Sequence, residues 1–181
     1  MIEMIVDRVQ VSLMSQHRLV VLRDTQEERY LPIWIGAFES EAITLELQGM
    51  LRERPLTHDL LKATITEMGG AVRHIFINNL SKDVFYAQIN IEVNGDSIDI
   101  DSRPSDAIAL AVRLKAPIYV DKQVMDKAGI RPDRNVEPEI LGLDDEYADA
   151  MDPSEKVDET KLSAFADFVD TLNLDDFDED E

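Results

Sequence analysis

The sequence predicts an α+β fold, with a mixed, largely antiparallel sheet and helices packed on it. Strand-like segments come in consecutive runs instead of alternating singly with helices, which favours antiparallel pairing over a doubly wound sheet. Asn94-Gly95 separates two such segments, and both residues tolerate the positive φ of a type I′ hairpin turn. The expected order is βββ-αα-βββ-α-β-α, followed by a C-terminal amphipathic helix.

The first half of the chain shows three strand patterns and then two helix patterns. Apolar and polar residues alternate in the first strand, and short apolar runs mark the next two. Apolar residues cover much of the first helix, which indicates burial in the core or against another subunit. Thr57 is expected to cap the second helix, and a glycine pair ends it. The strands are expected at 2–13, 19–22 and 30–35, and the helices at 37–52 and 58–68.

The second half begins with three further strands, of which the middle one alternates cleanly between apolar and polar residues. A helix of small and apolar residues follows and is expected to pack closely against another element. A short strand and a last helix, which Asp121 caps and Gly129 ends, complete the pattern. The strands are expected at 72–80, 85–93, 97–101 and 117–120, and the first of the two helices at 107–114.

Charge divides the chain into a body and a tail. The 181 residues carry a formal net charge of −20. Residues 144–181 contain 16 acidic and 2 basic side chains, a net of −14, which leaves −6 for the rest. We expect a folded domain over 1–130, an acidic linker over 131–153, and an acidic amphipathic helix and tail over 154–181. Neither region has the basic character of a non-specific nucleic-acid binder.

Other features of the composition exclude several classes of protein. The chain has no cysteine, which rules out a disulfide scaffold, a thiolate zinc site and a cysteine nucleophile. It has three histidines, too few to favour a multi-histidine metal site. There is no leader-like start and no apolar stretch long enough for a membrane span. We therefore expect a soluble, cytoplasmic protein with no membrane partner.

Three segments carry the residues on which chemistry could depend, namely 36–43, 54–60 and 101–111. In each of them a carboxylate lies where a helix begins, and Gly36 lets the backbone turn sharply into the first of these helices. An acid near the positive end of a helix dipole is favourable in itself, so each segment also has a purely structural explanation. His58 lacks that explanation, because a helix N-terminus disfavours a cation; a neutral imidazole, available as a base or a ligand, is expected there.

The third segment contains the densest group. Alternation along the strand places Asp99, Asp101 and Arg103 on the face opposite Ile98 and Ile100. Two carboxylates on one strand face can share a divalent cation, although a solvated face of an antiparallel sheet has the same pattern. Ser102 or Ser105, with Pro104 and Asp106, forms a good helix start.

Taken in order, the segments resemble the signatures of the bifunctional nuclease (DNase/RNase) family. The matching runs are Leu31-Pro32-Ile33-Trp34-Ile35-Gly36 with Glu39 and Ala42-Ile43, then Arg54-Pro55-Leu56-Thr57-His58-Asp59-Leu60, and then Asp101-Ser102-Arg103-Pro104-Ser105-Asp106-Ala107-Ile108-Ala109-Leu110-Ala111. The resemblance spans residues 1 to about 130 and departs from the usual pattern at Ser40 and Ser102, where alanine is common. It implies an α+β domain, a homo-oligomer and an activity on both DNA and RNA. The end of the chain resembles the acidic helical tail of one branch and lacks the helical-hairpin module of another.

The first functional hypothesis is a metal-assisted phosphodiesterase acting on nucleic acid. The expected catalytic residues are Glu39, His58, Asp59, Arg103 and Asp106, with His58 as the general base or acid. Phosphate or substrate binding is assigned to Arg54, Arg103 and Ser105. The carboxylates expected to hold Mg²⁺ or Mn²⁺ are Glu39, Asp59, Asp101 and Asp106.

The second hypothesis is a non-enzymatic binding or regulatory module. Arg54 and Arg103 would then pair with the carboxylates in a structural network between helix starts. The apolar first helix would build a dimer, and the acidic tail would bind a basic partner or mimic nucleic acid. A phosphoesterase acting on small molecules is a third alternative.

Overall fold

The computed structural model describes residues 1–11, 18–50 and 52–131, and contains the βββ-αα-βββ-α-β-α order that the sequence predicts. The expected linker from 132 on and the expected C-terminal helix lie outside the described residues. The elements are β1 Ile2–Val11, β2 Arg18–Asp24, β3 Tyr30–Ile35, α1 Ala37–Leu47, α2 Thr57–Glu67, β4 Gly70–Ser81, β5 Val84–Val93, β6 Asp96–Ser102, α3 Pro104–Leu114, β7 Ile118–Val120 and α4 Lys122–Ala128.

The strands of the described residues form one seven-stranded sheet in the order β3-β2-β1-β7-β4-β5-β6. Two antiparallel groups, β1–β3 and β4–β6, are joined by the short strand β7, which is antiparallel to β1 and parallel to β4. The sheet is therefore mixed and largely antiparallel, as expected. Asn94 and Gly95 have φ values of 53° and 91°, which confirms the type I′ turn between β5 and β6.

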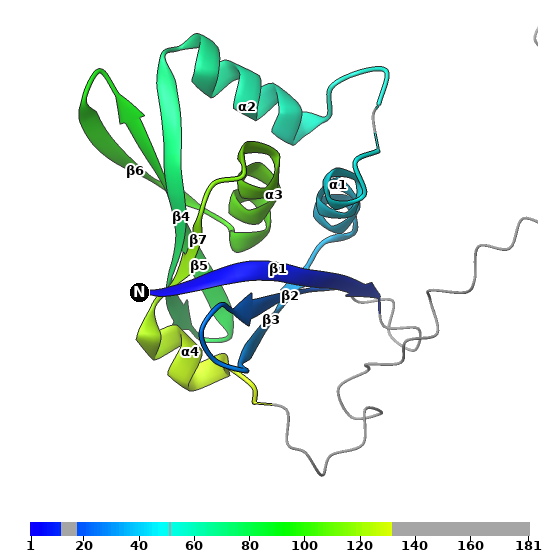
Figure 1. Cartoon of the computed structure of the whole chain (residues 1–181), viewed down its shortest axis with the longest axis vertical. Coiled ribbons are helices and arrows are strands. Elements are labelled where there is room, and N and C mark those ends of the chain that lie inside the picture. Colours follow the sequence, from blue (N-terminus) through cyan, green and yellow to red (C-terminus); the bar gives the residue numbers. More distant parts are fainter. Residues whose placement is uncertain (12–17, 51, 132–181) are drawn as a thin grey trace, which may run out of the picture. The chain divides into compact units, whose positions relative to one another are not determined.

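Helix α3 lies at the centre of the core. Its small and apolar residues from Ala107 to Ala111 are all buried, and they pack with Ile75, Ile77 and Ile89 of β4 and β5. Helices α1 and α2 flank α3, and α4 lies apart from them near β3 and β4 (Figure 1). Because α1 and α2 both pack on α3, their N-terminal turns are brought to the same region as the start of α3.

Three expected helix boundaries are wrong, each for a local reason. Helix α1 ends at Leu47 instead of residue 52, because Gly49 takes a positive φ of 65° and the chain turns back. Helix α2 begins at Thr57, so Leu56, not Thr57, is its N-cap. Helix α3 begins at Pro104 with Arg103 as its N-cap, and neither Ser102 nor Ser105 takes that position.

None of the helices within the described ranges combines the length and the apolar character that crossing a bilayer requires.

Candidate functional site

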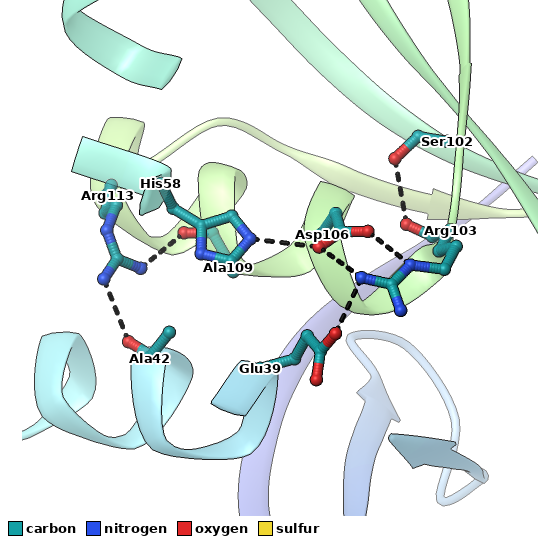
Figure 2. Close-up of polar contacts among 8 residues, drawn as sticks. All are labelled: Glu39, Ala42, His58, Ser102, Arg103, Asp106, Ala109 and Arg113. Atoms are coloured by element: carbon teal, nitrogen blue, oxygen red, sulfur yellow. Dashed lines mark hydrogen bonds and ion pairs between the residues drawn. The ribbon is translucent and has the colours of Figure 1, made fainter. Parts of the chain in front are cut away.

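The first turns of α1, α2 and α3 meet through four polar side chains, Glu39, His58, Arg103 and Asp106, which we call the helix-start cluster (Figure 2). Each helix supplies at least one of them, and all four were expected to be catalytic. The three segments thus converge in space, as a shared site requires.

Arg103 holds the cluster together with its planar guanidinium group. Its Nε lies 2.7 Å from Asp106 Oδ2, while Nη2 lies 2.6 Å from Glu39 Oε1 and 3.0 Å from Asp106 Oδ1. These hydrogen bonds, first to Asp106 and then to Glu39, raise the pKa of Arg103 above its ordinary value. The Arg103 side chain is nevertheless 66% exposed, against 15% for Glu39 and 28% for Asp106. The cluster therefore presents a positive group to solvent over two shielded carboxylates.

Asp106 links the arginine to the histidine. Burial raises the pKa of Asp106, but the hydrogen bonds from Arg103 and His58 and the charge of Arg103 outweigh this effect, and its pKa lies below the ordinary value. Asp106 therefore remains ionised at neutral pH and can accept hydrogen bonds from both neighbours.

His58 lies buried behind Asp106. Its Nε2 is 3.1 Å from Asp106 Oδ1, and its Nδ1 is buried and has no hydrogen-bond partner among the described residues. A neutral ring with the proton on Nε2 fits these surroundings, because it donates to Asp106 and leaves a lone pair, not an N–H, without a partner.

Gly36 fixes the position of Glu39 by leaving space for it. The backbone of Gly36 is extended (φ −74°, ψ 165°), a conformation open to any residue, so the expected need for backbone freedom is wrong. A Cβ atom at Gly36 would instead overlap Glu39 Oε2. A side chain at this position would displace the Glu39 carboxylate, which folds over Gly36 on the way to Arg103.

A second arginine, Arg113, lies nearer the other end of α3 and was not singled out in the sequence. Its Nε is 2.7 Å from Asp59 Oδ1, and its other nitrogens donate to the carbonyl oxygens of Ala109 (2.8 Å) and Ala42 (3.1 Å). The side chain is 2% exposed. The available signal was its spacing: Arg113 lies seven residues after Asp106 and four after Ala109, on the same face of the helix.

Asp59 belongs to this second pair and not to the helix-start cluster. Its Oδ2 accepts the backbone N–H of Leu56 at 2.8 Å, and its other oxygen accepts from Arg113. Burial raises the pKa of Asp59. These two hydrogen bonds and the charge of Arg113 together lower it by more than burial raises it, so the net shift of the pKa is downward. Asp59 thus fixes the start of α2 and ties it to α3.

The remaining expected site residues lie outside the cluster contacts. Asp101 is exposed on β6, Arg54 is exposed before α2, and Ser105 is buried in the first turn of α3. Asp99, expected to share a cation with Asp101, accepts a hydrogen bond from Asn90 Nδ2 at 2.7 Å.

The expected metal ligands do not form a cation site in this arrangement. Among the described residues, no three histidine or acidic side chains are placed to hold a metal ion. The Glu39 and Asp106 carboxylates face the guanidinium group of Arg103, which already supplies a positive charge there. We therefore derive no chemical step through a metal.

Comparison with known proteins identifies the family. Residues 20–133 match the family model of the bifunctional nuclease domain. An uncharacterized protein of Mycobacterium tuberculosis is 38% identical over 160 residues, which cover 88% of this chain and 87% of that protein. Bifunctional nuclease 2 of Oryza sativa subsp. japonica is 33% identical over 128 residues, and the match covers 68% of this chain but 38% of the rice protein. Bifunctional nuclease 2 of Arabidopsis thaliana is 31% identical over 121 residues, which cover 65% of this chain and 37% of that protein.

Proposed function

This chain belongs to the bifunctional nuclease family, and we propose that it hydrolyses phosphodiester bonds of DNA and RNA at the helix-start cluster. The observation that carries this proposal is the exposed guanidinium group of Arg103, which Glu39 and Asp106 hold in a fixed orientation. Glu39 and Asp106 engage Nε and Nη2, so among the described residues the N–H groups of Nη1 are left to donate to a phosphate oxygen. The guanidinium also stabilises the charge that develops on the phosphate in the transition state.

Each residue of the cluster then has a role that its surroundings support. Arg103 binds the scissile phosphate, and Glu39 orients Arg103. The general base or acid role was expected for His58, but Asp106 is the more exposed member of the Asp106–His58 pair. We therefore assign the base role to the ionised Asp106 carboxylate, which accepts the proton, and His58 orients that carboxylate through its Nε2 hydrogen bond. Arg54 and Ser105 remain our proposed additional contacts to the substrate. Asp59 supports the site by fixing the start of α2.

Cleavage of labelled oligonucleotides by the purified full chain tests the proposal. The substrates are single-stranded DNA and RNA, with a mononucleotide ester as the control for a small-molecule phosphoesterase. We expect cleavage of both oligonucleotides and a loss of about 100-fold or more in Asp106→Asn, the range for removal of a general acid or base. Arg73→Gln, which breaks an ion pair with Glu92 on β4 and β5, is the matched control and should retain activity. Equal cleavage by Asp106→Asn, or cleavage of the mononucleotide ester alone, would contradict the proposal.

Parallel reactions with Mg²⁺, Mn²⁺ or EDTA decide whether a divalent cation takes part. Activity that survives EDTA means that arginine side chains, Arg103 first, neutralise the phosphate without a metal ion. Activity that requires a cation would place a metal ion at the site, with Glu39, Asp59, Asp101 and Asp106 as the ligands to test by substitution.

One observation favours the second candidate function, a non-catalytic binding module. Every carboxylate of the cluster is already paired with an arginine, as a structural network requires. Two surface hollows of the described part of the chain lie elsewhere, one at the β2–β3 turn and one between α1 and Arg18 of β2. Retention of nucleic-acid binding without turnover in the same assay would favour this function.

We also propose that a second copy of the chain packs on an apolar surface of α1 and β3. Phe38 is 85% exposed, and Trp34, Leu47 and Met50 are exposed near it in the sequence. Sedimentation of the full chain should show a dimer that Phe38→Glu converts to a monomer. Leu60→Glu, which changes an exposed leucine of α2, is the control and should leave the dimer intact. A monomeric wild type would overturn the proposal.

A further inference from the structure

Strand β6 forms one edge of the sheet and is open for additional pairing. Within the described residues it pairs with β5 alone, in continuous register from Ala87↔Ser102 to Val93↔Asp96. The strand has seven residues, no proline and no bulge. Proline, bulges and covering segments are the usual devices that protect an edge from other strands.

Strand β3, at the other edge, has such protection. It contains Pro32, which cannot donate a backbone hydrogen bond. Tyr30 also exchanges two backbone hydrogen bonds with Ile130, at 2.8 and 2.7 Å, which covers the start of the strand. The two edges of the same sheet therefore differ, and β6 is the accessible one.

The hairpin geometry determines which backbone groups of β6 are free. In a two-residue hairpin the residues flanking the turn, here Val93 and Asp96, form a hydrogen-bonded pair. The alternation then directs the N–H and C=O groups of Ser97, Asp99 and Asp101 toward the open edge. An incoming strand can bond to these three residues without disturbing the pairing with β5.

The inner face of β6 is apolar and uncovered. Ile98 and Ile100 lie opposite Ile91 and Ile89, which are 5% exposed and belong to the core. Ile98 and Ile100 are 47% and 45% exposed, although they continue the same face of the sheet. An added strand would therefore gain apolar contacts on this face as well as backbone hydrogen bonds.

The outer face of β6 carries the acids Asp99 and Asp101. Pairing two copies of β6 around Asp99 would bring like charges together, which is unfavourable. Opposite charges across a strand pair are favourable, so basic residues suit this face.

We propose that the β6 edge binds an extended peptide segment of another protein in which basic and apolar residues alternate. The segment adds an eighth strand to the sheet. Its apolar side chains lie on Ile98 and Ile100, and its basic side chains lie beside Asp99 and Asp101. This interaction surface leads into Arg103 but uses none of the four residues of the helix-start cluster, and the inference does not depend on the nuclease proposal.

Amide hydrogen exchange of the nitrogen-15-labelled full chain tests this surface residue by residue. The probe is a capped heptapeptide of alternating lysine and valine, and the matched peptide has glutamate in place of lysine. With the lysine peptide we expect exchange at Ser97, Asp99 and Asp101 to slow by about tenfold or more. The amides of Ile98 and Ile100 already bond to β5 and should change little. Residue resolution is essential because the acidic tail can attract a lysine peptide by charge alone.

Two variants separate the edge from general electrostatics. Asp99→Lys should abolish the protection by the lysine peptide, while Asp126→Lys on α4 makes the same charge change elsewhere and should preserve it. The proposal is overturned by equal protection with the glutamate peptide, or by changes confined to the tail. It is also overturned if the three amides become protected without peptide as the protein concentration rises, since the occupant is then a second copy.

Discussion

Arg103 and Arg113 lie near opposite ends of α3, and each ties α3 to α1 and α2. Arg103 reaches Glu39 on α1 and, through Asp106, His58 on α2. Arg113 reaches Ala42 on α1 and Asp59 on α2. Their environments are opposite, because the side chain of Arg103 is 66% exposed and that of Arg113 is 2% exposed.

From this difference we expect Arg113 to act mainly on stability and Arg103 mainly on the proposed activity. Deleting a buried arginine is costly, because its partners are then left without a counter-charge and without a hydrogen-bond donor. An exposed ion pair contributes little to stability because water and salt screen it. A solvent-facing guanidinium held by fixed carboxylates is instead suited to binding an incoming anion.

The largest effect on stability is expected from Arg113→Met. The substitution leaves Asp59 without its ion-pair partner and the carbonyl of Ala42 without its donor, so we expect a loss of about 3 kcal/mol in the free energy of unfolding. Urea denaturation measures this loss. Lys62→Met, which removes a single 3.0 Å hydrogen bond to the carbonyl of Arg113, should cost about 1 kcal/mol or less. An equal loss in both variants would show that the buried Arg113–Asp59 pair stabilises the fold no more than a single hydrogen bond does.

Arg103→Gln is expected to act mainly on activity. Loss of one transition-state donor lowers turnover by about 100-fold, while the free energy of unfolding should change by less than about 1 kcal/mol. Oligonucleotide cleavage and urea denaturation on the same preparations measure the two effects. Arg73→Gln removes an exposed arginine that also pairs with a carboxylate through two nitrogens, and should affect neither strongly. If Arg103→Gln lost stability as well as activity, Arg103 would be a structural arginine like Arg113, and the expected difference between the two would be wrong.

The acid limb of the stability profile should depend on Asp59. Because the folded-state pKa of Asp59 lies below its unfolded value, its contribution is present above the unfolded pKa, about 3.9. It is lost as the pH falls through the folded-state pKa. Urea midpoints at pH 7 and pH 3 should therefore differ less in Asp59→Asn than in the wild type. An unchanged difference would assign the acid sensitivity to other carboxylates, of which Asp106 is the first to test.

The smallest effect is expected from Gly36→Ala. The extended backbone accepts alanine, so stability should change by less than about 1 kcal/mol. The new Cβ displaces the Glu39 carboxylate and loosens Arg103, which should lower cleavage by about threefold to tenfold. Alanine at Gly129, where a Cβ would instead meet the Met125 carbonyl and side chain, is a control that should lower stability without this selective loss. Full activity in Gly36→Ala would mean that Glu39 does not position Arg103.

The order of elements could be predicted because it rests on local patterns. Alternation identified the strands, and Asn94-Gly95 identified the hairpin turn through its backbone preference. Helix ends were less predictable, because Thr57 looks like a cap, yet Asp59 accepts the N–H of Leu56 and moves the boundary by one residue.

By itself, the sequence determined the strands, the helices and the three motif segments, because periodicity and turn preferences act over a few residues. It also placed acids, a histidine and an arginine at helix starts. The tertiary structure decided how they pair: Asp59 with Arg113, and Glu39 and Asp106 with Arg103. These choices depend on the packing of α1 and α2 against α3, which sets both the distance and the burial of each charge. Local spacing contains neither quantity, and the difference between the exposed Arg103 and the buried Arg113 rests on both.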